Sequence, residues 1–194
     1  MMTYSVYHPH PGYSQGMTDM LTPIVYVFND ESMSYLAFCS LVNRYMNPLF
    51  DRDQIEINDR LQLFHLIFQS IDNDLAKKIY SNEENSFFVY RWLLLDCKRE
   101  FHSFDHVLRA LELVWIYSMF SPCQSTINDR RLFSIFLSIS ILQEDQEKIF
   151  ACSTEEDFYQ YFYSSSSSAR SSRSIRRIFQ RAQIYYFNYS SSTR

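Results

Sequence analysis

The 194-residue chain has only two glycines, Gly12 and Gly16, and they lie within five positions of each other. Loops that cradle phosphates in P-loop and Rossmann proteins need several glycines at fixed spacing, so we expect the chain itself to bind no nucleotide. Two of the five prolines, Pro9 and Pro11, lie in the same segment. Glycine permits a positive φ and close approach of a ligand, and proline stiffens the neighbouring chain. The backbone is therefore specialised in one place, residues 8–17.

The chain also lacks cysteines at metal-ligand spacing. Its four cysteines are Cys39, Cys97, Cys123 and Cys152. They form no C-x-x-C pair, and His8 and His10 have no carboxylate or cysteine at ligand spacing, so we expect no metal site. Scattered cysteines of this kind are typical of reduced, buried thiols, which favours the cytosol.

Long apolar runs are missing as well. No run approaches the roughly 20 residues that span a bilayer, and no basic-then-apolar leader stands at the N-terminus. We therefore expect a cytoplasmic protein with no transmembrane segment. No Ser/His/Asp set or nucleophile elbow is present, which argues against an ordinary hydrolase.

Positive charge is scarce before residue 164. The formal net charge is -4, but the chain after Ser164 carries six arginines and no acid, which leaves 12 basic against 22 acidic residues before it. These arginines are Arg170, Arg173, Arg176, Arg177, Arg181 and Arg194. An acidic body of this kind is not expected to bind nucleic acid.

Apolar residues at helical spacing are abundant. Hydrophobic residues make up 46% of the chain and aromatic residues 18%, and no segment alternates as a strand does. Helices are expected at 16–28, 32–46, 57–71, 75–80, 87–95, 104–115, 129–142, 154–163 and 174–187. The pattern predicts an all-α, single-domain, irregular multi-helix array. Arg91 lies in the most apolar of these helices, which we expect to be central, so its guanidinium needs a carboxylate partner.

Two blocks resemble the TBC domain, the all-helical fold of Rab GTPase-activating proteins. The segment from Tyr13 to Ile24 is similar to the family signature Y-x-Q-G-M-x-D-L-x-x-P-I. Residues 87–101, F-F-x-x-R-W-L-L-L-x-x-K-R-E-F, resemble a second block of the family. The resemblance extends over most of the chain and implies an irregular multi-helix array.

One family block has no counterpart here. TBC domains carry I-x-x-D-x-x-R upstream of Y-x-Q-G, and its arginine enters the GTPase site; only fourteen residues precede Gln15, and none is arginine. The chain is therefore expected to be an N-terminally truncated TBC domain at 1–187. A serine-rich run at 164–174 interrupts it, and a disordered tail at 188–194 follows it. We expect the run to be a flexible linker; the alternatives are a phosphorylatable Arg-Ser segment, an anionic-membrane patch, or a sequence irregularity within an otherwise normal helical end.

The resemblance assigns roles to particular residues. It implies that Gln15 is a glutamine finger supplied in trans to a GTP-loaded Rab, with Tyr13, Gly16 and Asp19 forming the partner-binding loop. The resemblance also implies that Gly12, Arg91 and Trp92 have structural roles. From the residues alone, Gln15 could instead cap local backbone groups at the helix start, and Asp19 could serve the helix dipole.

The implied function is GTPase activation in vesicle trafficking, by a regulator and not an enzyme. GTP and Mg²⁺ belong to the partner, so no cofactor is expected, and the chain could reach endomembranes peripherally through the Rab. Without the arginine finger we expect weak activity. The alternatives are a non-catalytic Rab-binding scaffold module and an incomplete fragment of an active Rab activator.

Overall fold

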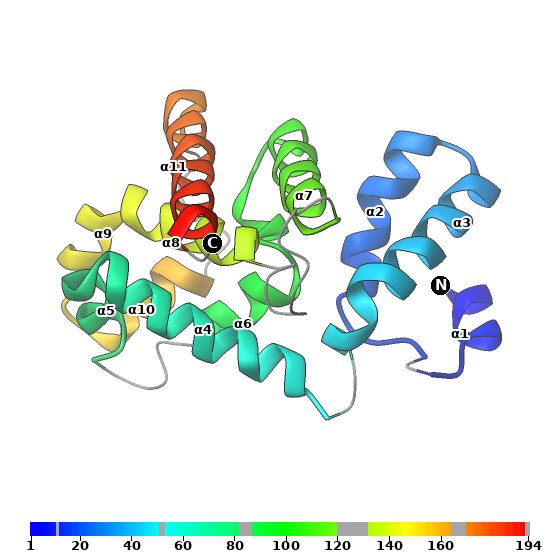
Figure 1. Ribbon diagram of the computed structural model, residues 1–194, viewed down its shortest axis with the longest axis horizontal. Coiled ribbons are helices and arrows are strands. Elements are labelled where there is room, and N and C mark those ends of the chain that lie inside the picture. The colour runs from blue at the N-terminus through cyan, green and yellow to red at the C-terminus, as the bar shows by residue number, and fades with distance from the viewer. Residues whose placement is uncertain (11, 51–52, 82–86, 120–131, 164–169, 193–194) are drawn as a thin grey trace. The chain divides into compact units, whose positions relative to one another are not determined.

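The computed structural model describes residues 1–10, 12–50, 53–81, 87–119, 132–163 and 170–192 (Figure 1). Within these ranges every regular element is a helix and none is a strand, which confirms the all-α fold. No helix of this part of the chain combines the length and apolar character that a bilayer span requires.

The chain divides into two compact units, Met1–Asp59 and Arg60–Arg194, where the sequence analysis expected one domain. The division falls inside a single helix, α4 (Ile55–Ile71). Helical periodicity shows that each segment has an apolar face, but it does not show which segments share a core. The division into units therefore depends on tertiary contacts.

The first unit contains the glycine-proline segment. Its regular elements are α1 (Met2–Tyr7), α2 (Met17–Phe28), α3 (Glu31–Leu41), a π-helical turn (Val42–Met46) and a 3-10 turn (Asn47–Phe50). Helices α2 and α3 pack against each other (Figure 1). Their shared core consists of side chains at most 1% exposed: Tyr4, Met17, Met20, Phe38, Val42 and Met46. The expected helix 32–46 is thus an α-helix that ends at Leu41 and continues as a π-turn.

Helix α2 begins and ends at left-handed residues. Gly16 precedes it with φ 103°, and Asn29 follows it with φ 46°. Asp30 then caps α3, because its carboxylate accepts a hydrogen bond from the Met33 amide at 2.7 Å. Two consecutive turn residues therefore reverse the chain between the helices.

The second unit surrounds helix α8. Its elements after α4 are α5 (Asn73–Ile79), α6 (Phe87–Leu94), a 3-10 turn (Lys98–Glu100), α7 (Phe104–Met119), α8 (Leu132–Glu144), α9 (Gln146–Ala151), α10 (Glu155–Tyr163) and α11 (Ser172–Ser192). Every residue of 132–142 is buried, and α8 contacts α6, α7, α9 and α11.

The central helix is thus α8, not the segment 87–95 that the sequence analysis favoured. Phe87 of α6 is 69% exposed. Helix α8 contains Ser134, Ser138 and Ser140, so a smaller fraction of its residues is apolar than in 87–95. All three serines are nevertheless buried. The Ser138 hydroxyl donates to the Ser134 carbonyl at 2.8 Å, so a buried polar group is satisfied within the helix.

The last described helix, α11 (Ser172–Ser192), is longer than the expected helix 174–187. Helix α11 runs to Ser192, through residues 188–192 that were expected to begin a disordered tail. Tyr189 packs against Phe136 of α8, with ring centroids 5.8 Å apart, which gives the last turns a tertiary contact. Of the serine-rich run, residues 164–169 lie outside the described ranges.

Candidate functional site

Gln15 lies at the apex of a tight turn between α1 and α2. The Met17 amide donates to the Ser14 carbonyl at 3.1 Å, which closes a β-turn. Gly16, at the third position, has φ 103° and ψ -22°, a left-handed conformation that strains any residue with a Cβ. Gln15 itself is exposed. The glycine therefore holds a backbone shape that presents the glutamine to the surface.

The turn is attached directly to helix α2. The Gly16 carbonyl accepts hydrogen bonds from the amides of Asp19 and Met20, at 3.0 Å and 3.4 Å. Met17 is fully buried, and its Sδ accepts from the Ser14 amide at 3.5 Å. The N-cap residue of α2 is thus Gly16. The side-chain amide of Gln15 makes no hydrogen bond to any of the described residues. This geometry disfavours the capping role that the residues alone allowed for Gln15.

The other end of the loop is held by His8. Its ring stacks on Tyr4, with centroids 4.6 Å apart and planes at 20°, and its Nε2 lies 3.8 Å from the Cys39 Sγ. Gly12 has φ 77°, and a Cβ at that position would lie 3.2 Å from the Pro9 carbonyl oxygen. From the sequence we predicted no role for His8, although the i, i+4 spacing of Tyr4 and His8 is a signal that could have indicated the stack.

The other residues assigned to the partner loop flank Gln15. Tyr13 is 52% exposed, and Asp19 is half-buried in the first turn of α2. Tyr13 and Gln15 therefore contribute neighbouring exposed side chains to one loop. No lysine or arginine precedes Arg44 in the sequence, so these first 43 residues supply an amide and a phenol but no permanent cation.

Arg91 and Trp92 lie within the second unit. Nη2 of Arg91 is 3.2 Å from the Glu100 Oε1 and donates to the Phe162 carbonyl at 3.0 Å. Trp92 is 2% exposed. Burial raises the pKa of Glu100, while Arg91 and Arg170 act to lower it. Arg91 thus has the carboxylate partner that an arginine in an apolar helix requires.

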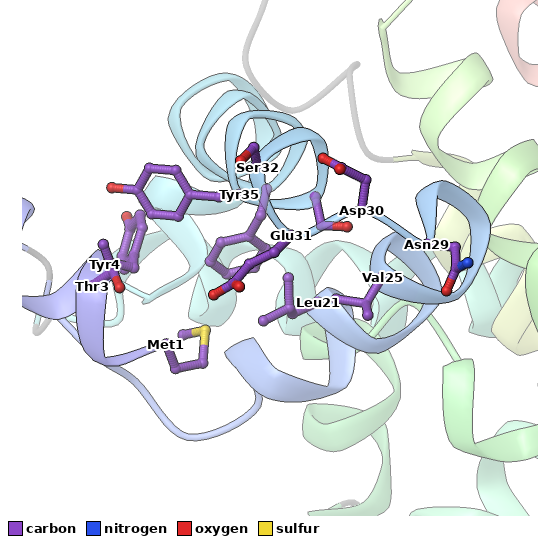
Figure 2. Close-up of a pocket in the computed structure, with 12 residues that line it drawn as sticks. Met1, Thr3, Tyr4, Leu21, Val25, Asn29, Asp30, Glu31, Ser32 and Tyr35 are labelled. Carbon is purple, nitrogen blue, oxygen red and sulfur yellow. The ribbon is translucent and has the colours of Figure 1, made fainter.

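A pocket of about 580 Å³ lies in the first unit between α1, α2 and α3 (Figure 2). Leu21, Tyr35 and the carboxylate of Glu31 line it, whereas Gln15 does not. The Asp30 carboxylate at its edge is already engaged in capping α3. The exposed glutamine is therefore outside this cavity.

Comparison with known proteins assigns the chain to a family. The model of the Rab-GTPase-TBC domain matches residues 1–150, so α10 and α11 lie beyond the match. TBC1 domain family member 25 of Homo sapiens is 35% identical over 116 residues, 59% of this chain and 17% of that protein. GTPase-activating protein GYP7 of Saccharomyces cerevisiae is 30% identical over 153 residues, 77% of this chain and 18% of that protein.

The chain spans less than a fifth of the length of these relatives. The family match covers far more than half of the chain: all of the first unit, which includes the Gln15 loop, and residues 60–150 of the second. The resemblance carried by the two sequence blocks is thereby confirmed: the chain belongs to the Rab-GTPase-TBC domain family.

Proposed function

We propose that the chain accelerates GTP hydrolysis by a Rab-family small GTPase, and that Gln15 is the side chain it supplies to the partner's nucleotide site. The observation that carries the proposal is the exposed Gln15 at the apex of a turn held by Gly16 and the buried Met17. Membership of the Rab-GTPase-TBC domain family supports it, as does the yeast relative named as a GTPase-activating protein.

The chemistry of GTP hydrolysis explains why a glutamine is suited to this role. The transition state is loose, so a catalyst contributes mainly by orienting the attacking water and by neutralising charge on the transferred group. A glutamine amide has both a donor and an acceptor and can orient water. The Gln15 amide makes no hydrogen bond among the described residues, so no internal bond has to break before it acts.

The residues beside Gln15 meet the partner in this proposal. Tyr13 offers an exposed ring and hydroxyl two residues before the glutamine, and Asp19 follows one helical turn after it. GTP and Mg²⁺ are held by the GTP-loaded Rab, which makes the chain an activator of an enzyme and not an enzyme. The chain then approaches endomembranes from the cytoplasm through its partner.

The 194 residues by themselves form a weak activator in this proposal. An arginine supplied to a GTPase contributes on the order of 10³ to 10⁵ in rate, and residues 1–43, which include the Gln15 loop, contain no arginine. This lack of a permanent cation in these 43 residues favours a second candidate function, a Rab-binding scaffold module that engages the GTPase without accelerating it.

The test is single-turnover GTP hydrolysis across a panel of GTP-loaded Rab proteins. We expect the chain to accelerate at least one Rab, and Gln15→Ala to lower that acceleration at least tenfold. Gln69→Ala is the matched control, because Gln69 is an exposed glutamine of α4 outside the loop. Binding of a loaded Rab without any acceleration would leave the scaffold function, and no binding to any Rab would reject both.

A further inference from the structure

We propose that His8 is a positioning residue for Gln15, an inference that rests on the proposed function. His8 is the first residue after α1 and begins the loop that ends at Gly16. Its ring stacks on Tyr4, and its Nε2 lies 3.8 Å from the Cys39 Sγ of α3. The imidazole therefore attaches the upstream end of the loop to two helices at once.

This attachment reaches the core of the first unit. Tyr4 is 1% exposed, and its ring meets Phe38 edge to face, with centroids 5.3 Å apart and planes at 76°. The backbone reinforces the contact, because the His8 amide donates to the Tyr4 carbonyl at 2.8 Å. We call Tyr4, His8 and Phe38 the aromatic anchor. Its three rings form a continuous path from α3 through α1 to the start of the loop.

The described residues between the anchor and the glutamine, 9, 10 and 12–14, have little freedom. Pro9 has a restricted φ. Gly12, with φ 77°, comes so close to the Pro9 carbonyl that a Cβ would lie 3.2 Å from its oxygen. The Ser14–Met17 turn then closes on the fully buried Met17. A shift of His8 is therefore passed along the loop to Gln15, which has to be held to a fraction of an ångström to orient a water.

Three variants separate positioning from binding. His8→Asn removes the ring, His8→Phe keeps a ring that can stack, and His10→Asn changes an exposed histidine of the same loop as the control. We expect His8→Asn to lower the stimulated single-turnover rate about tenfold, with affinity for the GTP-loaded Rab unchanged. His8→Phe should recover most of the rate, and His10→Asn should alter neither quantity. An equal loss of affinity and rate would overturn the proposal.

A second measurement needs no GTPase. Hydrogen exchange at the Met17 amide reports the bond that closes the turn, and the Asn29 amide, bonded to the Val25 carbonyl at 2.9 Å, reports the far end of α2. His8→Asn should accelerate exchange at Met17 and leave Asn29 unchanged. Unchanged exchange at Met17 overturns the positioning role, as does faster exchange with an unchanged hydrolysis rate. If the unsubstituted chain accelerates no Rab, the proposed function fails, and the exchange data alone decide whether His8 holds the loop.

Discussion

Asp145 and Arg170 form a buried ion pair in the second unit: Nη2 of the arginine lies 2.6 Å from Oδ2 of the aspartate, and the side chains are 4% and 6% exposed. The same carboxylate accepts a hydrogen bond from the Tyr161 hydroxyl at 2.7 Å and pairs with Lys148 at 3.1 Å. Arg170 also donates to the Glu100 carbonyl at 2.7 Å. The Asp145 carboxylate, between α8 and α9, therefore binds Arg170, which lies just before α11.

Removing the arginine of this pair should destabilise the protein strongly. We expect Arg170→Met to lower the free energy of unfolding by about 3 kcal/mol, because it leaves a buried carboxylate without its main cation. Arg177→Met is the control, since Arg177 is 53% exposed and pairs with Glu144. Urea unfolding monitored by circular dichroism measures both. Equal losses in the two variants would show that burial of the pair does not matter.

The same pair should make stability depend on acid pH. Burial acts to raise the pKa of Asp145, but Arg170, Tyr161 and Lys148 outweigh it and hold the pKa below its usual value. A carboxyl whose pKa is lower in the folded state contributes stability above its unfolded pKa of about 3.9, and this contribution is lost as pH falls through the folded pKa. The stability difference between the unsubstituted protein and Arg170→Met should therefore be smaller at low pH than at neutral pH. A difference that does not change with pH would contradict this explanation.

The Gln15 turn should be sensitive to a single methyl group. Gly16→Ala places a Cβ on a residue with φ 103° and should cost about 1–3 kcal/mol of stability. Ser14→Ala is the control, because Ser14 contributes its backbone amide and carbonyl to the turn and both remain. Thermal unfolding compares them. If the two variants melt together, the left-handed conformation at Gly16 is not a constraint.

The cysteines should differ in their rates of alkylation. The thiolate is the reactive form. Burial raises the pKa of the fully buried Cys97 thiol, and burial also raises that of Cys152, whereas Cys39 is half-buried. Among these three cysteines of the described residues, labelling of the native protein with N-ethylmaleimide, followed by peptide mass spectrometry, should modify Cys39 first and Cys97 last. Modification of Cys97 as fast as Cys39 would mean that α8 does not shield it.

The apolar spacing in the sequence predicted helix α2 well. The apolar stripe that begins at Met17 and Met20 is the buried face of α2, and the helix ends at the predicted Asn29. The same stripe continued to Val25, which is 46% exposed. Periodicity shows which side chains share a helix face, but burial also requires a neighbour to cover that face.

The ion-pair partners of the C-terminal arginines could not be predicted from the sequence. Arg170 belongs to the serine-rich run that was expected to be a flexible linker, whereas its side chain is buried against Asp145. Arg177, in the expected helix 174–187, pairs with Glu144. These partners lie 25 and 33 positions apart in the chain. Composition shows that a stretch is basic, but it does not show which acidic side chains will form ion pairs with its arginines.

The sequence by itself determined the glycine turn, the helical class and the family, because each depends on residues that are neighbours in the chain. A glycine allows a left-handed φ wherever it stands, and a helix repeats its contacts every three to four residues. Only the tertiary structure decided that α8 is the central helix, that Asp145 pairs with Arg170, and that His8 stacks on the buried Tyr4 at the start of the loop. Those relationships depend on packing between helices, and packing selects among many pairings that the same apolar and charged residues allow.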